Sequence, residues 1–218
     1  MRGFRMGGSV LAVVAVAFAM TGEASATDEG AVTFEGGPSV RLGSMSPSVG
    51  SGDAVKRVSF GARVGMRYGF TSRLEVQASG FWEWRATFVH EPATVPSAGG
   101  GLSGALTEDV SRFGASAGVR YALLGMVWRM PVGVDVGWTH TSLTDRDLLG
   151  TPGRASLGLN LGDGTSDQLS LAPFVGLEWL ATDRLSFSIV PRVELLVGSP
   201  SAVSVIVPFT MGWSFYWF

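Results

Sequence analysis

The chain lacks several residue types on which common stabilising and catalytic devices depend. It has no cysteine, so neither a disulfide bond nor a thiolate-ligated metal is available to it. It has a single lysine, Lys56, and a formal net charge of −2, a balance that excludes a strongly basic nucleic-acid-binding surface. Its 31 glycines favour a tightly curved sheet over a helical bundle. A packed core or a hydrogen-bonded sheet must therefore hold the protein together.

The first 26 residues have the pattern of an export signal. Arg2 and Arg5 precede the apolar run Val10–Met20, and Ala24-Ser25-Ala26 places small residues at the spacing of a signal-peptidase site. The run is shorter than the roughly 20 apolar residues that a membrane-spanning helix needs. We expect cleavage after Ala26, which leaves residues 27–218 as one exported domain.

A four-residue pattern recurs four times after the signal. In each copy a glycine and a mostly polar residue alternate with an apolar residue and an aromatic one. Such alternation predicts a β-strand with two different faces. The copies are Gly-Met-Arg-Tyr at 65–68, Gly-Val-Arg-Tyr at 118–121, Gly-Leu-Glu-Trp at 176–179 and Gly-Trp-Ser-Phe at 212–215.

Eight alternating segments follow one another along the exported part of the chain. Short turns are predicted near residues 71–72, 125–129 and 182–183, and a short connection at 198–201. Longer connections rich in glycine, serine and proline are predicted at 44–56, 90–110 and 142–166. An even number of strands with short turns at the periplasmic end is typical of outer-membrane barrels. The predicted strands are Ala31–Gly43, Arg57–Phe70, Arg73–Val89, Ser111–Leu124, Met130–Thr141, Asp167–Ala181, Arg184–Val197 and Ala202–Phe218.

The aromatic residues of the apolar face fall into two belts. Such belts, separated by an aliphatic band, are expected where a barrel meets the two surfaces of a bilayer. A soluble sandwich, which buries the apolar face against a second layer, is the alternative. We therefore expect an all-β, eight-stranded antiparallel transmembrane barrel. The inner belt comprises Tyr68, Tyr121, Trp179 and Phe215, and the outer belt comprises Trp82, Trp84 and Trp138, joined by Phe60 and Phe113, with Phe88 also facing outward.

These features resemble those of the small bacterial outer-membrane β-barrel families, namely the OmpA transmembrane domain, OmpX and OmpW. The resemblance rests on the strand count, the turn sequence Tyr-Gly-Phe-Thr-Ser-Arg-Leu at 68–74, its echo Leu-Ala-Thr-Asp-Arg-Leu at 180–185, and the aromatic C-terminal strand. It implies outer-membrane lipid and lipopolysaccharide as surroundings, and recognition of the last strand by the barrel-insertion machinery.

The polar face carries charges of both signs. An eight-stranded barrel is only just wide enough for side chains to fill it, and an unpaired buried charge is costly. We therefore predict a plugged, ion-paired interior without an open pore, with Arg67 near Glu75. Inward glycines (Gly61, Gly65, Gly114 and Gly118) leave room for a small or lateral path. The predicted interior network comprises Arg41, Arg63, Arg67, Glu75, Glu83, Arg85, Arg120, Asp135, Glu178, Arg192 and Glu194.

One short motif suggests chemistry. His140 and Ser142 share the lipid-facing parity near the outer end of a strand, and this His-x-Ser pair resembles that of the outer-membrane lipid A deacylases. The resemblance implies a histidine that activates a serine against an acyl ester in the outer leaflet. Asp145 or Asp147 would have to orient the histidine, since the family's asparagine, alanine and glutamate are absent. An interfacial histidine is the simpler interpretation.

The predicted function is that of a non-enzymatic outer-membrane barrel, structural or surface-exposed, acting in envelope integrity, adhesion or ligand contact through its external loops. OmpW-like passage of small apolar molecules is the first alternative, and lipid A deacylation by His140 and Ser142 is the second. No cofactor, metal or nucleic-acid partner is predicted. The loop residues Asp145, Asp147, Asp163 and Asp167 lack the spacing of a calcium loop.

Overall fold

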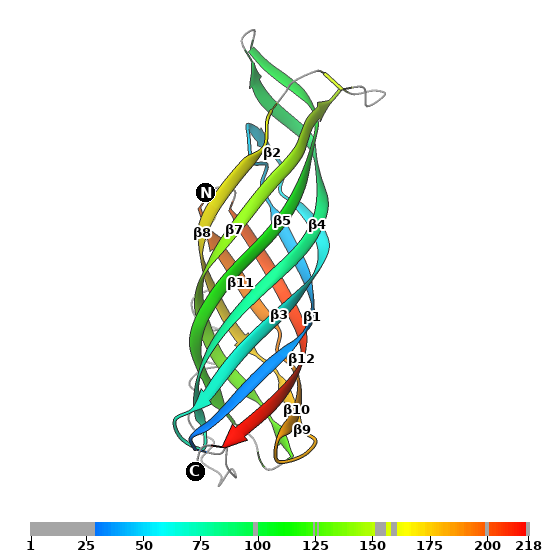
Figure 1. The fold of residues 1–218 in the computed structure, drawn as a ribbon. Helices are drawn as coiled ribbons and strands as arrows, with labels where there is room; N and C mark the ends of the chain where they lie inside the picture. Colours follow the sequence, from blue (N-terminus) through cyan, green and yellow to red (C-terminus); the bar gives the residue numbers. More distant parts are fainter. Residues whose placement is uncertain are drawn as a thin grey trace.

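The computed structural model describes residues 29–97, 100–123, 125, 127–150, 156–157, 161–198 and 201–216. The predicted signal peptide and the terminal Phe218 lie outside these residues. Antiparallel strands dominate the fold (Figure 1). They are β1 (Ala31–Met45), β2 (Ser51–Gly52), β3 (Val55–Gly69), β4 (Leu74–Ser97), β5 (Gly100–Ala122), β6 (Trp128–Arg129), β7 (Pro131–Leu149), β8 (Gly164–Val175), β9 (Leu177–Leu180), β10 (Leu185–Ile189), β11 (Arg192–Val197) and β12 (Ala202–Tyr216).

The sheet closes on itself into a ring of eight strand positions. β1 pairs with β3 on one side and with β12 on the other, from Ala31 opposite Tyr216 to Met45 opposite Ala202. β8 with β9 occupies one position of the ring, and β10 with β11 occupies the next. Closure removes the free edges of the sheet and separates an inside from an outside. The sandwich alternative is therefore wrong, and the eight-stranded barrel is confirmed.

Two of the eight strands are interrupted at matching positions. Gly176 separates β8 from β9, and Pro191 lies between β10 and β11, where its missing N–H cannot join a ladder. A Cβ on Gly176 would lie 2.4 Å from the carbonyl oxygen of Ile189, so only glycine allows the two neighbouring strands to approach this closely. The Val175 N–H still donates to the Pro191 carbonyl at 3.3 Å, which keeps the wall continuous.

The strands extend further beyond the outer belt than the sequence predicts. Residues 90–97 and 100–110, predicted as a long loop, form the upper part of the β4–β5 hairpin, with Val95 opposite Leu102. The hairpin rises well above the rest of the barrel in Figure 1. Its inner face is apolar, with Ala93, Val95, Leu106 and Leu148 packed together and Val49 and Leu161 against them. This small second core explains why glycine- and proline-containing segments form strands here.

A β-bulge in β4 changes which side chains face the interior. The register between β4 and β5 shifts between Glu83 and Ala86, so the inward side moves from odd to even residue numbers. Phe88, predicted to face lipid, is consequently only 3% exposed. It packs in an apolar layer across the lumen, formed by Met45, Phe88, Val110, Leu143, Leu196 and Ala202.

No helix among the described residues is long and apolar enough to cross a bilayer.

Substitution of Phe88 tests the bulge and the layer it creates. We expect Phe88→Ala to destabilise the barrel by about 3–5 kcal/mol, because it opens a cavity in a packed interior. Phe60→Ala is the control, since Phe60 is 58% exposed on the outer face and lipid can fill the space. Urea unfolding of the protein in lipid vesicles measures both. A larger loss for the Phe60 variant would contradict the inward position of Phe88.

Candidate functional site

The lumen is filled by buried ionic side chains arranged at three heights. At the end of the barrel where β1 begins and β12 ends, Arg67 lies 3.1 Å from Glu35, 3.1 Å from Glu75 and 2.8 Å from Glu178. Arg120 adds a contact of 3.1 Å to Glu75 and an ion pair with Glu178. The strand register places Glu75 directly opposite Arg120, so the two neighbouring strands bring side chains of opposite charge together at this height. The predicted proximity of Arg67 and Glu75 is present.

The middle height is centred on Asp135 of β7. This carboxylate accepts from Arg63 at 3.2 Å and from Arg192, while Gln77 donates to its other oxygen. Arg63 also donates to the hydroxyls of Ser79 and Ser116. One carboxylate therefore holds two arginines, while the two serines accept from Arg63 and the Gln77 amide donates to the carboxylate.

The upper height joins five strands of the wall, β1, β4, β5, β11 and β12. Arg41 pairs with both Glu83 and Glu194 and donates to Ser204 at 3.0 Å. Arg112, a residue absent from the predicted network, lies 3.6 Å from Glu83 and donates to the Met45 sulfur at 3.1 Å. Its guanidinium also stands 6.0 Å from the centre of the Phe88 ring. Arg112 thus joins the charged network to the apolar layer above it.

This arrangement leaves little free space along the barrel axis. The prediction that inward glycines leave room is wrong, because neighbouring atoms already occupy that space. A Cβ on Gly118 would lie 2.2 Å from an Asp135 carboxylate oxygen, and one on Gly61 would lie 2.3 Å from the Trp82 carbonyl oxygen. Buried ion pairs resist separation, since moving one partner leaves an uncompensated charge. The lumen is therefore filled by ion-paired side chains.

Arg85 does not join the interior network, so its inclusion there is wrong. It lies in the β4 bulge, its side chain is 53% exposed, and it pairs with Asp109 at 2.8 Å and with Asp145. The bulge places Arg85 on the outside, where it links three strands. The other ten members of the predicted network are buried inside the barrel, in the ion pairs just described.

Sequence reasoning missed a polar cluster above the apolar layer. His90 and Glu108 are fully buried, with His90 Nε2 3.5 Å from a Glu108 carboxylate oxygen. The other Glu108 oxygen accepts from the Ser48 hydroxyl, and His90 Nδ1 lies 3.3 Å from the Asp53 carbonyl. These contacts fasten the 46–54 connection to the β4–β5 hairpin. No sequence pattern indicated that His90 and Glu108 would meet, because the segments that carry these contacts were predicted as loops. Arg129, also missed, is buried opposite Glu178.

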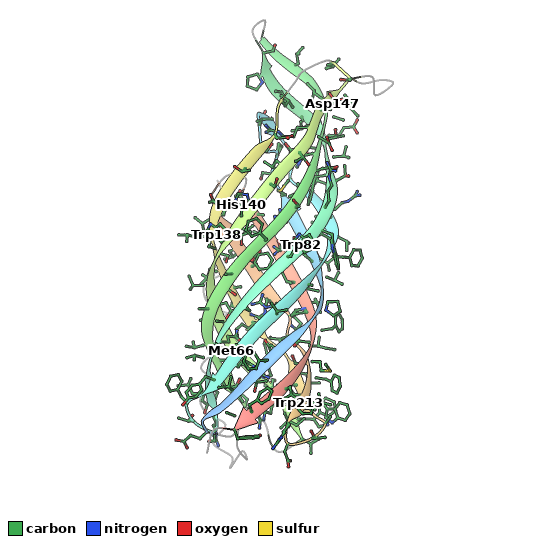
Figure 2. All side chains as sticks on the ribbon, in the orientation of Figure 1. Met66, Trp82, Trp138, His140, Asp147 and Trp213 are labelled. Carbon is green, nitrogen blue, oxygen red and sulfur yellow. The ribbon has the colours of Figure 1, made fainter. Side chains whose placement is uncertain are left out.

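The two predicted aromatic belts lie on the outer surface. Six of the seven belt residues are exposed and Tyr121 is partly covered; the exposed ones are Trp82, Trp84, Trp138, Tyr68, Trp179 and Phe215. In Figure 2, Trp82 and Trp138 lie in the upper half of the barrel, whereas Met66 and Trp213 lie near its lower end. Edge-to-face ring contacts support both belts, Phe113 with Trp138 above and Phe34 with Phe215 below.

His140 lies beside Trp138 in the outer belt (Figure 2). Its Nδ1 atom is 2.9 Å from a carboxylate oxygen of Asp167, which also accepts from the Trp138 indole at 3.1 Å. The prediction that Asp145 or Asp147 orients the histidine is wrong, since Asp145 pairs with Arg85 and Asp147 accepts from Ser156. Within the described residues, no hydrogen bond joins Ser142 to His140, and no acidic or histidine cluster is arranged to hold a metal ion.

The wall is incomplete between β3 and β4. Their ladder ends at Gly61 opposite Glu83, although β3 continues up to Val55 and β4 continues up to Ser97. Pairing with β4 resumes only through β2, where Gly52 lies opposite Ala93. We call this unpaired interval, between Val55–Phe60 and Trp84–Pro92, the β3–β4 seam. It lies at the β4 bulge, beside the apolar layer.

Glu178 is the shared counter-charge of Arg67 and Arg120 at one end of the lumen. We expect Glu178→Gln to destabilise the barrel by about 3–5 kcal/mol, because Arg67 and Arg120 lose a shared counter-charge in a buried site. Asp183→Asn, in the exposed β9–β10 turn, should change stability by less than about 0.5 kcal/mol. A urea titration followed by the folded and unfolded bands of an unheated gel measures both variants. Equal stability of the two variants would contradict the ion-paired plug.

Comparison with known proteins supports the architecture. No protein-family model matches the chain, and no curated protein is similar to it in sequence. Solved structures do match. Ail, the attachment invasion locus protein of Yersinia pestis, is 14% identical, with a TM-score of 0.51 over 86% of this chain and 100% of that chain. The outer-membrane protein OprG of Pseudomonas aeruginosa is 16% identical, with a TM-score of 0.52 over 89% and 100%. The chain therefore has the fold of the small eight-stranded outer-membrane β-barrels.

Proposed function

We propose that this protein is an exported, non-enzymatic outer-membrane barrel that stabilises the envelope or presents its external hairpin for adhesion or ligand contact. Residues 1–26 serve as a signal peptide cleaved after Ala26, and the barrel-insertion machinery recognises the C-terminal strand. Outer-membrane lipid and lipopolysaccharide surround the barrel. The observation that carries the proposal is a lumen filled by paired charges inside a wall whose outer surface is exposed and apolar.

The external region supports a role in surface contact. It is built as a folded extension with its own apolar core, and it is fastened by Glu108 to the 46–54 connection. A rigid projection loses less conformational entropy on binding than a mobile loop does. Ail, which shares the fold, is named for attachment and has been solved with the heparin analogue sucrose octasulfate.

The chemistry of the outer belt supports the absence of catalysis. His140 has an acidic partner, which is one requirement of a triad, but Ser142 makes no hydrogen bond to it in the described structure. Asp167 also binds Trp138. Anchoring of aromatic and histidine rings at the membrane interface accounts for both contacts of Asp167.

Fractionation of producing cells tests the proposal. We expect the protein in the outer-membrane fraction, beginning at Thr27, and migrating differently on gels before and after heating because the closed barrel survives detergent. A soluble or inner-membrane location, or identical migration, would contradict it. In the same cells, the lipid A mass should be unchanged. A loss of acyl chains that disappears in His140→Ala would instead establish the deacylase.

Passage of small apolar molecules is a second candidate, favoured by the β3–β4 seam. The seam opens toward lipid next to the apolar layer of Met45, Phe88 and Val110, and Ala86 packs against that layer at the bulge. An apolar solute could move between lipid and this layer without meeting the charged plug below. A path of this kind is lateral, so it needs no conductance along the axis.

A bulky residue at the seam distinguishes the two candidates. If the seam is a path, producing cells should accumulate radiolabelled naphthalene faster than cells carrying an empty vector. Ala86→Trp should then reduce accumulation to the vector level, because the indole fills the entrance to the layer. Ala62→Trp, on the outer face of β3, is the control and should leave accumulation unchanged. Equal accumulation with and without the protein would eliminate this candidate.

A further inference from the structure

A hollow on the outer wall lies where β12, β1 and β3 are adjacent, near their upper ends. Its lining is arranged in two rows by the strand register. In the upper row Ser44 lies opposite Lys56, and in the lower row Leu42 lies opposite Val58 and Val205. Arg57 completes the upper edge. Polar and cationic groups therefore stand directly above an apolar floor.

The height of this hollow relative to the membrane follows from the strand geometry. Lys56 is four residues above Phe60 on the same face of β3, and Phe60 belongs to the outer aromatic belt. At about 3.3 Å per residue on a strand tilted by about 40°, the separation along the membrane normal is roughly 10 Å. Aromatic belts mark the interface, so Lys56 and Arg57 lie on its outer, polar side, from which their long side chains can reach headgroup phosphates.

Neither cation is neutralised by the protein. Both Lys56 and Arg57 are exposed, and no ion pair among the described residues includes either of them. Other arginines of the outer half are engaged: Arg85 pairs with Asp109 and Asp145, and Arg146 donates to the Leu161 and Gly162 carbonyls. The nearest acid along the chain, Asp53, forms no ion pair with either cation in the part of the chain that the structure describes. The hollow therefore has excess positive charge at a surface where the anions are lipid phosphates.

We propose that this hollow binds an anionic lipid of the outer leaflet. Lys56 and Arg57 hold the headgroup phosphate, with the Ser44 hydroxyl as an additional donor, and an acyl chain lies along Leu42, Val58 and Val205. Arginine presents a planar pair of donors suited to phosphate oxygens, and lysine adds a compact charge. The inference rests on the outer-membrane location proposed above, and it adds a defined lipid site to it.

Lipid binding to the refolded full chain tests the site. The probe is dioleoyl phosphatidic acid, titrated into the protein in zwitterionic detergent and followed by native mass spectrometry, with dioleoyl phosphatidylcholine for comparison. We expect preferential binding of phosphatidic acid, roughly 25-fold weaker in the Lys56→Gln/Arg57→Gln variant, because each of the two interfacial cations contributes about a fivefold effect. Arg184→Gln, which removes an exposed cation at the opposite end of the barrel, should bind like the wild type.

Several results would overturn the proposal. These are equal binding of the two lipids, wild-type affinity in the double variant, or an equal loss in Arg184→Gln. Displacement of the lipid by millimolar inorganic phosphate would reveal a free-anion site instead, since the acyl contacts would then contribute nothing. Heat-modifiable migration verifies that each variant is folded, and the single variants replace the double one if it is not. A negative binding result in a protein that fractionates with the outer membrane would refute this site alone.

Discussion

Pairing of β1 with β12 is the constraint on which the rest of the structure depends. Thirteen residue pairs along this ladder close the sheet into a ring. Closure gives every strand one face toward a narrow lumen and one face toward the surroundings, with no free edge over most of the wall. A charged lumen is then stable only if nearly every charge has a partner. An apolar exterior is stable only if lipid covers it. The ion pairs and the exposed aromatic belts are two consequences of the same closure.

The interior divides into chemically distinct layers along the axis. Ion pairs around Glu178, Asp135 and Arg41 fill the lower part, and the apolar layer around Phe88 covers them. Above that layer, His90 and Glu108 are buried, and the second apolar core of the hairpin follows. The upper layers make the external region an extension of the barrel wall. Because ion-paired side chains occupy the axis, the surfaces that the fold leaves accessible are the outer wall, the seam and the hairpin that extends beyond the barrel.

Much of this arrangement could be predicted from alternation alone. The parity of Arg67, Glu75, Arg120 and Glu178 fixed their inward position, because a strand with period two has only two faces to offer. Prediction failed where one extra residue enters the ladder. The bulge at Trp84 and Arg85 reversed the parity of β4, so Arg85 moved outward and Phe88 moved inward. No local sequence signal marks a bulge, since it is set by pairing with the neighbouring strand. The external hairpin was missed for a related reason: its strands are held by packing of Val95, Leu106 and Leu148, which are far apart in sequence.

The upper segment of β3 connects the seam with the cationic hollow. Arg57 has the same parity as Ser59 and Arg63, which both face the lumen, yet Arg57 is exposed. Had β4 paired with this segment, Arg57 would be enclosed beside the apolar layer without a carboxylate, at a cost of several kcal/mol. The β4 bulge ends the ladder at Gly61, so the segment keeps only β1 as a neighbour and Arg57 can reach the surface. One bulge thus accounts for three features: the buried Phe88 layer, the unpaired interval in the wall, and a second exposed cation beside Lys56 above the outer belt.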